Sequence, residues 1–517
     1  MALPVLPAAA AVPASGAAAI TSAPGVRIAM ITLGCDKNTV DSERVQARLA
    51  ASGAALTGDP GQADVVVVNT CGFIDAAKEE SIDTLLEAVQ LKQAGRIRAV
   101  VALGCLVQRY KSELVATVPE VDLFLGLTEI DQLIPALRAK GIVGAAPNMQ
   151  QPLRRLAIST RHTSYLKVSE GCDHTCAFCA IPLMRGKHRS TPMEQLILEA
   201  RELEQTGVVE LNLISQDTTW YGRDLVRGAA EEGDGFIGRP FPRMKGIDVS
   251  DGRERGSREM RVPVRAHDER GHRRGLLVPL LETLLRETSI PWLRLFYMYP
   301  SGIYPELIEL MAREPRIVSY LDMPIQHGSD RMLTLMRRPE RRATILERVS
   351  GLRSVLPDLS LRTTIIVGFP GETDEDFRVM LDLLNEVRFD YLGAFAYSVE
   401  EDTPAAEMPD QVPDTVKRER LEELLDVQRS ITQEKNEARM GTITHVLIDR
   451  LTGRDSELLP AGSARGAVGR TPGQALEVDG VVHVADAAHL RPGSFVSVRL
   501  TDAMDQDMVG ELVQPQA

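Results

Sequence analysis

The sequence lacks any apolar run that approaches the roughly 20 residues needed to cross a membrane. It also lacks an excess of positive charge, because 59 Lys and Arg stand against 72 Asp and Glu, a formal net charge of −13. This balance argues against a dominant nucleic-acid surface and fits a basic partner. We therefore expect no membrane association and, from charge, no direct binding of nucleic acid.

No basic residue precedes Arg27. A secretory signal needs a positive start and an unbroken apolar core, and Pro4, Pro7 and Pro13 interrupt this segment. We interpret residues 1–25 as a disordered Ala- and Pro-rich extension, or as the result of a misplaced start codon. Without an export signal the chain is expected in the cytoplasm, where a reducing environment disfavours disulfides and favours metal ligation.

Cysteine is scarce, and the six in the chain form two triplets. One triplet is compact, with the pattern C-x-x-x-C-x-x-C, and consists of Cys172, Cys176 and Cys179. The other is spread out, with each member closing a run of apolar, β-branched residues, and consists of Cys35, Cys71 and Cys105. Three thiolates leave one iron of a four-iron cluster without a protein ligand, and an open iron can bind a small molecule. The triplets therefore predict two iron–sulfur clusters.

The length of 517 residues predicts about three domains. In the first, over residues 26–140, short apolar runs alternate with helical segments such as Ser42–Ala50 and Lys78–Leu91. The runs read as buried parallel strands and are Val26–Leu33, Asp64–Asn69 and Ala99–Leu103. We expect a doubly wound parallel α/β domain here.

Each cysteine of the spread triplet follows one of these strands, at intervals of 36 and 34 residues that match one βα repeat. In open α/β sheets, ligands bind at this edge. The alternative is three unrelated buried thiols, since free cysteine often packs as a small hydrophobe. Recurrence at one edge favours a shared ligand.

After a linker over residues 141–160, a second domain is expected over residues 161–440. Its strand-like runs are Tyr165–Ser169, Val208–Ser215, Trp292–Tyr299, Tyr320–Ile325, Leu361–Val367 and Tyr391–Tyr397. Six βα units predict a partial (β/α)6 barrel with its chemistry at the carboxyl ends of the strands, and the compact triplet follows the first strand. Val226–Gly275 lacks periodicity and reads as an inserted, mostly disordered loop, although its arginines could form a partner-binding patch.

The third domain, over residues 441–517, follows an amphipathic helix at Asp414–Met440. Its short β-rich runs are punctuated by Gly and Pro and are Thr444–Ile448, Val481–Val484 and Phe495–Leu500. This pattern is typical of a small antiparallel β-barrel.

The compact triplet lies in the segment Glu170–Pro182, where Gly171 eases the turn of a loop that can wrap three corners of a cubane. The alternative is a zinc site completed by His174 or His188. Zinc sites usually use paired C-x-x-C knuckles, and the sequence holds no second pair. The motif therefore favours an iron–sulfur cluster.

This motif at the end of a barrel's first strand resembles that of the radical S-adenosylmethionine (SAM) enzymes. The resemblance implies that SAM chelates the open iron through its amino and carboxylate groups. It also implies reductive cleavage of SAM to methionine and a 5′-deoxyadenosyl radical, which takes hydrogen from an unreactive carbon.

The surroundings of the spread triplet narrow the resemblance to the methylthiotransferases. Leu33–Glu43, Asn69–Ile74 and Gly104–Tyr110 are similar to the amino-terminal domain of that family, and the last domain resembles its TRAM domain, which docks the substrate. The implied cofactors are SAM and two 4Fe–4S clusters held by the six cysteines. A sulfur on the second cluster would be methylated by SAM and then joined to the substrate.

Two branches of that family share this plan, one modifying an adenosine of tRNA and the other the β-carbon of an aspartate in ribosomal protein S-twelve. The segments that resemble the second branch are Cys35–Asn38, Gly72–Lys78, Gln108–Tyr110, Ser215–Thr219 and Phe369–Glu372. Charge agrees, because Met440–Ala517 has six basic residues against ten acidic ones, whereas a tRNA-docking module needs clustered Lys and Arg. An acidic barrel suits a basic ribosomal protein. Modification of tRNA, or a non-catalytic metal-stabilised binding protein, remain the alternatives.

Several residues near strand ends are candidates for contacting SAM, namely Ser215, Gln216, Arg362 and Gly368, with Asp217, Gln326, His327 and Gly371 in similar positions. Each could instead be a turn or supporting residue, and Arg362 could face the SAM carboxylate or lie at a solvated end. The basic run Arg185–Arg189 could balance cluster charge, although a solvated face is more common. The resemblance also implies an electron donor such as a flavodoxin or ferredoxin, and we expect a monomer.

Overall fold

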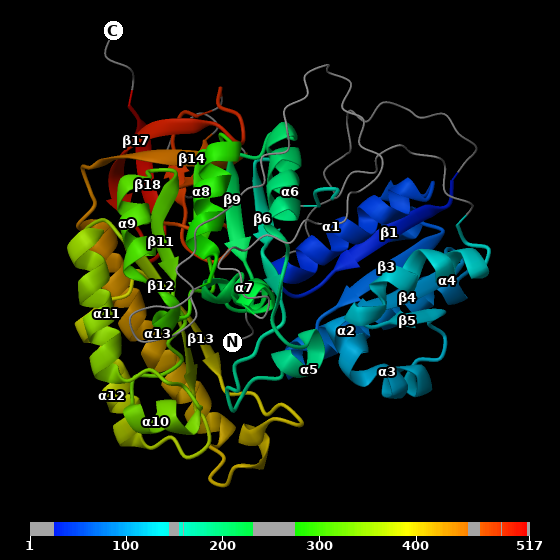
Figure 1. Cartoon of the computed structure of the whole chain (residues 1–517), viewed down its shortest axis with the longest axis horizontal. Helices are drawn as coiled ribbons and strands as arrows, with labels where there is room; N and C mark the ends of the chain where they lie inside the picture. The colour runs from blue at the N-terminus through cyan, green and yellow to red at the C-terminus, as the bar shows by residue number, and fades with distance from the viewer. Residues whose placement is uncertain are drawn as a thin grey trace. The chain divides into compact units, whose positions relative to one another are not determined.

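The computed structural model describes residues 25–143, 155–158, 160–230, 275–452, 466–487 and 489–513 (Figure 1). The predicted extension and most of the predicted linker and insertion lie outside the described residues. The chain divides into two compact units. The first runs to Ser159 and includes Phe178–Gly186 and Ser398–Ala406, and the second takes in the rest.

The first unit contains a five-stranded parallel sheet in the order β2-β1-β3-β4-β5. The strands are β1 (Arg27–Thr32), β2 (Ala55–Thr57), β3 (Val65–Thr70), β4 (Ala99–Gly104) and β5 (Leu123–Leu125). Every residue of β3 and β4 is buried, which explains their continuous apolar sequence. The sequence did not predict β2 and β5, because each is an edge strand of only three residues, shorter than the apolar runs that indicate a strand.

Helices cover both faces of this sheet, so the predicted doubly wound plan is confirmed. On one face, Val45 of α1 and Leu137 of α4 pack against Val65 and Val67. On the other, Leu85 of α2 and Leu106 of α3 pack against alternate strand residues. The helices are α1 (Asp36–Ala51), α2 (Asp75–Gln93), α3 (Cys105–Thr117) and α4 (Leu133–Ala139). Helix α1 starts earlier than the predicted Ser42, because its first two turns are polar and show no apolar periodicity although they are largely buried.

The second unit contains a six-stranded parallel sheet in the order β13-β12-β11-β10-β9-β6, as predicted for a partial barrel. The strands are β6 (Thr163–Lys167), β9 (Glu210–Ile214), β10 (Trp292–Leu295), β11 (Ile317–Asp322), β12 (Ser360–Val367) and β13 (Tyr391–Ala396). Strand β10 ends four residues before the predicted boundary at Tyr299, because Tyr297 has a φ of 55° and cannot continue an extended strand.

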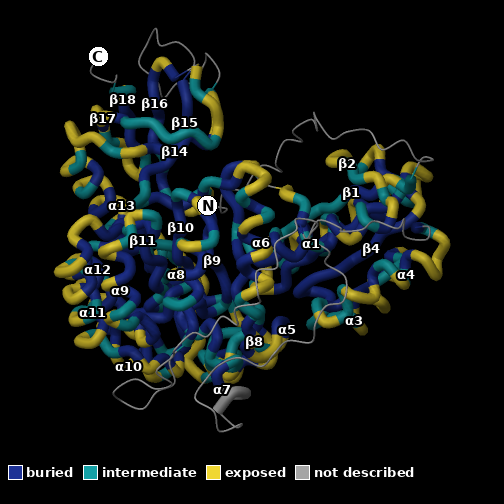
Figure 2. Tube along the Cα trace, turned by 45° about the horizontal axis from the view of Figure 1, so that its top comes forward, coloured by how far each residue is buried: buried dark blue, intermediate teal, exposed yellow. Residues whose placement is uncertain are grey.

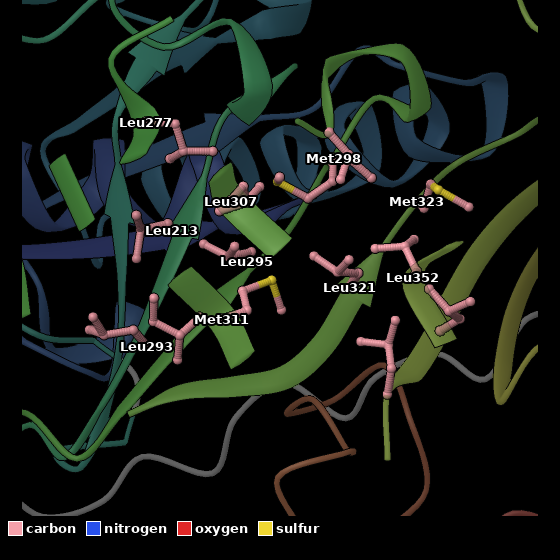
Figure 3. Packing of buried hydrophobic residues seen from close by; sticks show 14 of the residues in the cluster. Leu213, Leu277, Leu293, Leu295, Met298, Leu307, Met311, Leu321, Met323 and Leu352 are labelled. Carbon is pink, nitrogen blue, oxygen red and sulfur yellow. The ribbon is translucent and has the colours of Figure 1, made fainter. Parts of the chain in front are cut away.

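A continuous layer of helices packs on this sheet, with each helix touching the next along the chain (Figure 1). They are α6 (Met193–Gln205), α8 (Leu277–Glu287), α9 (Pro305–Arg313), α11 (Arg342–Val355), α12 (Asp374–Val387) and α13 (Asp414–Glu437). Figure 3 shows the core between the two layers, where Leu213, Leu293 and Leu321 of three strands meet Leu307 and Leu352 of two helices. Figure 2 shows the strands buried and the outer helix faces exposed. Within these described ranges, no helix is both long and apolar enough to span a membrane.

Helix α7 (Arg223–Ala230) corrects the predicted start of the insertion, since residues 226–230 continue this helix. The inserted sequence after Ala230 shows no helical periodicity of apolar residues, and residues 231–274 lie outside the described part of the chain.

A closed five-stranded barrel ends the second unit, in the order β14-β15-β16-β18-β17. Its strands are β14 (Ile443–Leu451), β15 (Ala467–Arg470), β16 (Val482–Val484), β17 (Phe495–Ala503) and β18 (Met508–Leu512). The predicted antiparallel pairing holds for four strand pairs, but β16 and β18 pair in parallel and close the barrel. Strands β15 and β18 were not predicted, because a glycine interrupts each short apolar run.

A buried ion-pair network joins this barrel to the six-stranded sheet. The Glu210 carboxylate lies 2.9 Å from Arg294 Nε and also pairs with Arg470, and all three side chains are inaccessible to solvent. Arg470 Nε pairs in turn with Asp449 Oδ2 at 2.8 Å, and His162 Nε2 lies 2.9 Å from Asp449 Oδ1. Buried ion pairs therefore hold the terminal barrel against the six-stranded sheet.

Replacing Glu210 by Gln is expected to lower the free energy of unfolding by about 3–5 kcal/mol, because it strands two buried guanidiniums. Burial alone would raise the pKa of Glu210, but Arg470 and Arg294 lower it to about 2. A folded-state pKa below the unfolded one stabilises the fold at neutral pH, and this contribution is lost as the pH falls toward 2. Urea unfolding at pH 7 measures the effect, with the exposed Glu309→Gln as control; equal midpoints for both variants would contradict it.

Candidate functional site

The three cysteines of the spread triplet lie at one edge of the first unit's sheet. Cys35 caps the amino end of α1 just after β1, Cys71 directly follows β3, and Cys105 begins α3 directly after β4. The strands β1, β3 and β4 are adjacent and parallel, so their carboxyl ends share this edge. The backbone there is tightly packed, because a Cβ on Gly34 would lie 2.8 Å from Cys71 Sγ. Adjacent parallel strands thus bring together thiols that are far apart in the sequence.

Two of these thiols are buried, and their burial raises their pKa. Cys71 and Cys105 are buried, whereas Cys35 is exposed. Burial raises the pKa of the Cys71 thiol and raises that of Cys105 to about 12. A thiol ligates a metal as the thiolate, so a cluster bound here would displace these protons.

The Asn38 side chain ties the three strand ends together. Its Nδ2 donates to the carbonyl oxygens of Leu33 at 2.8 Å and Thr70 at 3.2 Å, at the ends of β1 and β3. Its Oδ1 accepts from Arg185 Nη2 at 2.6 Å and from the Cys105 thiol at 3.8 Å. A buried asparagine therefore fixes the loops that carry the triplet, with a cation next to the thiols.

The basic run Arg185–Arg189 is solvated, as is more common for such runs, at Lys187 and Arg189, but it is buried at Arg185 and His188. Arg185 ends α5 (Ile181–Arg185), is buried, and lies 3.2 Å from Asp41 Oδ2. His188 is also buried, whereas Gly186, Lys187 and Arg189 are exposed. The short helix turns Arg185 inward, where Asp41 and Asn38 compensate its burial, so the charge-balancing interpretation fits Arg185 alone.

The compact triplet lies in an irregular loop between β7 (Ser169–Glu170) and α5. Its members are all partly accessible, and Gly171 has a φ of +74° that eases the start of the loop. Burial raises the pKa of the Cys172 thiol to about 12. The boundary between the two units falls inside this loop, so Cys179 belongs to the first unit and the other two cysteines to the second.

The histidines that could complete a zinc site have other partners. His174 Nε2 lies 2.7 Å from Asp217 Oδ2, and His188 Nε2 lies 3.1 Å from Ser190 Oγ. Among the described residues, no three or more Cys, His, Asp or Glu side chains are grouped to hold one metal ion. A four-iron cluster takes one thiolate per iron, so its ligands stand farther apart than those of a single ion. Because His174 and His188 are engaged elsewhere, the three cysteines fit a cluster with one open iron better than a zinc site completed by either histidine.

Two predicted SAM contacts lie at the carboxyl end of β9, although Ser215 is fully buried with its Oγ 3.3 Å from Thr218 Oγ1. Ser215 and Gln216 directly follow β9, and Gln216 Nε2 lies 3.4 Å from Glu170 Oε1. The Oε1 atom of Gln216 is buried and has no hydrogen-bond partner. A buried acceptor without a donor suits the amino or hydroxyl groups of a bound nucleoside.

Gly368 occupies a corresponding position after β12, with a φ of +69°. A Cβ there would lie 2.3 Å from Lys417 Cγ, and its N–H donates to Glu372 Oε2 at 2.9 Å. The glycine is thus required by the packing of Lys417, whatever it contributes to a ligand. Gln326 and His327 follow β11, and His327 Nε2 lies 3.4 Å from the same Glu372 oxygen.

Arg362 is placed differently from the other candidates. It is the third residue of β12, and its guanidinium pairs with Asp322 at 3.1 Å and with Asp479 at 3.4 Å. Asp479 belongs to the segment between β15 and β16, so Arg362 links the sheet to the terminal barrel. Two carboxylates already satisfy its charge, and no described contact joins it to Gln216 or Ser215.

Sequence reasoning missed one cation beside the compact triplet. Arg338 Nη1 lies 3.9 Å from Cys176 Sγ, within hydrogen-bond reach of a thiolate. The residue follows α10 (Asp330–Leu335) instead of a strand, so the search along strand ends passed over it. The only signal in the sequence was the cluster of arginines after Met336.

Comparisons with known families cover all three parts of the chain. The family described as "Uncharacterized protein family UPF0004" matches residues 27–126, the Radical SAM superfamily matches residues 265–384, and the TRAM domain matches residues 440–513. These matches agree with an α/β domain, a radical SAM barrel and a small terminal barrel.

Two curated relatives are similar over nearly the whole chain. "Ribosomal protein uS12 methylthiotransferase RimO" of Anaeromyxobacter sp. (strain Fw109-5) is 41% identical over 94% of this chain and 93% of its own. The protein of the same description from Geobacter sulfurreducens is 39% identical over 94% and 98%. Among solved structures, the radical S-adenosylmethionine methyltransferase TsrM from Kitasatospora setae has a TM-score of 0.49 at 13% identity, covering 84% of this chain and 81% of its own.

Proposed function

The chain belongs to the ribosomal protein uS12 methylthiotransferase (RimO) family, and we propose that it adds a methylthio group to the β-carbon of an aspartate in uS12. It is a radical SAM enzyme that uses SAM and 4Fe–4S clusters. The observation that carries the proposal is the arrangement of two cysteine triplets, one at the carboxyl ends of three adjacent parallel strands and the other in the loop that follows β6 and β7.

We assign one cluster to each triplet. Cys172, Cys176 and Cys179 would hold the cluster that binds SAM and supplies the electron for its cleavage, and the spread triplet would hold the second cluster, which would supply the methylthio group. When bound, the clusters and SAM supply the radical chemistry and the sulfur. Asn38 holds the loops of the spread triplet in place, and the buried Arg185 offsets the negative charge of its thiolates.

The chain's other residues bind and orient. Gln216 offers its buried Oε1 atom to a donor group of SAM, and Ser215 lies beside it at the end of β9. Gly368 follows β12 and therefore lies at the same carboxyl edge of the sheet as Gln216. The geometry of Arg362 supports a role in fixing the terminal barrel, so we rank it last among the candidate SAM contacts.

The substrate assignment rests on charge as well as on family. The terminal barrel carries ten acidic residues against six basic ones, and one of the six, Arg470, is buried in ion pairs. The remaining charge favours a basic protein partner over tRNA phosphates. We further propose a monomer that works in the cytoplasm, takes electrons from a flavodoxin or ferredoxin, and makes no direct contact with nucleic acid.

The test is a mass measurement on each substrate. Reconstituted enzyme, SAM and a reductant are incubated with uS12 or with tRNA. We expect uS12 to gain about 46 Da, the mass of methylthio in place of hydrogen, and tandem fragmentation to place it on one aspartate. A gain on tRNA alone would establish the sister activity, and a chain with one zinc and no sulfide would instead be a metal-stabilised binding protein.

A further inference from the structure

A stack of planar side chains lies beside Cys176, built from residues that follow three strands and one helix. The imidazole of His174 stacks on the Tyr299 ring, with centroids 3.9 Å apart and planes within 7°. The guanidinium of Arg338 also lies over Tyr299, with its carbon 3.9 Å from the ring centroid. Asp217 fixes the far end of the stack through its 2.7 Å contact with His174.

The guanidinium of Arg338 is held in one orientation by contacts on several sides. Its Nη2 donates to the Pro324 carbonyl at 2.8 Å, and the Tyr299 ring supports its flat face. Only about 5% of the residue is exposed. The remaining terminal nitrogen, Nη1, is the one that lies 3.9 Å from Cys176 Sγ. Fixed donors lose little entropy on bonding, so this contact can persist.

The backbone also keeps Arg338 close to the cysteine loop. The N–H of Ala177, next to Cys176, donates to the Met336 carbonyl at 3.0 Å. Arg337 then adopts a left-handed conformation with a φ of 57°, which ends α10 and turns the chain toward Arg338. The separation of Arg338 from Cys176 is therefore set by main-chain geometry as well as by the side-chain contacts.

We propose that Arg338 is a positioning residue that donates an N–H···S hydrogen bond to the Cys176 thiolate and thereby makes the cluster at the compact triplet easier to reduce. The inference rests on the proposed function, which places a cluster on Cys176. Reduction adds an electron to a cluster with thiolate ligands, and a cation that hydrogen-bonds to one sulfur stabilises the added charge. A protein sets the reduction potential of an iron–sulfur cluster through hydrogen bonds to the sulfurs, the net charge nearby and the exposure of the cluster to solvent.

The ion pair between Arg338 and Glu340 makes it possible to separate a purely structural role of Arg338 from an effect on the reduction potential. Arg338 Nε lies 3.3 Å from Glu340 Oε2, and both side chains are about 4% exposed. Neither oxygen of Glu340 has a hydrogen bond in the described structure. Removing Arg338 alone would strand this carboxylate, so the informative variant removes both charges together.

The experiment compares Glu340→Gln with the double variant Arg338→Met/Glu340→Gln in the full-length chain. Both also carry Cys35→Ala, Cys71→Ala and Cys105→Ala, so that one cluster remains. Iron analysis checks the cluster content, and electron paramagnetic resonance follows reduction at set potentials. We expect the ratio of reduced to oxidised cluster at a fixed potential to be about tenfold lower in the double variant, a midpoint about 59 mV more negative.

Each result bears on the proposal. Arg338→Lys keeps the positive charge but lacks the planar guanidinium. Its midpoint potential is therefore expected to lie between those of Glu340→Gln and Arg338→Met/Glu340→Gln. If the double variant binds no iron, Arg338→Lys replaces it in the comparison. Equal midpoints in variants with the same iron content would overturn the role of Arg338 and leave the proposed function intact. Absence of a reducible cluster in Glu340→Gln itself would overturn both.

Discussion

Replacing Cys172, Cys176 and Cys179 together by Ser is expected to abolish both SAM cleavage and methylthio transfer. The hydroxyl of serine is a poor ligand for the irons of a cluster, which are held by thiolates. Without that cluster there is no electron to cleave SAM and no open iron to bind it. Production of 5′-deoxyadenosine, measured by chromatography, should fall to that of a reaction without enzyme, and uS12 should keep its unmodified mass.

The matched control is the triple variant in which Cys35, Cys71 and Cys105 are replaced by Ser, because it removes the same number of thiols from the same chain. Production of 5′-deoxyadenosine at the wild-type rate by the Cys172, Cys176 and Cys179 variant would show that SAM is cleaved elsewhere. The circular dichroism of both variants reports whether the fold survives, since the compact triplet lies in an irregular loop and contributes to no helix or strand.

Replacing Cys35, Cys71 and Cys105 together by Ser is expected to leave SAM cleavage intact and to abolish methylthio transfer. These thiols lie after β1, β3 and β4 of another sheet, and no described strand of the radical SAM barrel carries them. Their loss removes the source of the transferred group but not the radical. The product 5′-deoxyadenosine should therefore still form, while the gain of about 46 Da on uS12 disappears. Transfer at the wild-type rate by this variant would show that the assignment of the second cluster is wrong.

Much of the fold could be predicted from strands that are apolar along their whole length. The runs ending at Asn69 and Leu103 are buried on both faces, so their position and parallel pairing follow from composition. The edge strands β2 and β5 are only three residues long, which is too short for composition to identify them as strands. The parallel pairing of β16 with β18 also escaped prediction, because it closes a barrel through contacts between segments that no local pattern connects.

The candidate site was predictable where chemistry follows a strand. A cysteine after each of three successive strands was enough to place the spread triplet at one edge. Arg338 lies in the segment after α10 and Asn38 lies in α1, and their roles depend on distances of 3.9 Å and 3.8 Å to sulfur atoms that only the folded chain brings near. Arg362 shows the converse, since its position in a strand did not reveal that Asp322 and Asp479 already pair with it.

The number of irons held by each triplet tests most directly the claim that the six cysteines form two independent centres. The measurement is iron and acid-labile sulfide per chain in anaerobically reconstituted wild type and in the two triple variants. The account predicts about eight irons and eight sulfides in the wild type and about four of each in either variant, one 4Fe–4S cluster per triplet. Loss of all iron from both variants would mean that the cysteines build a single shared centre, and would contradict the account.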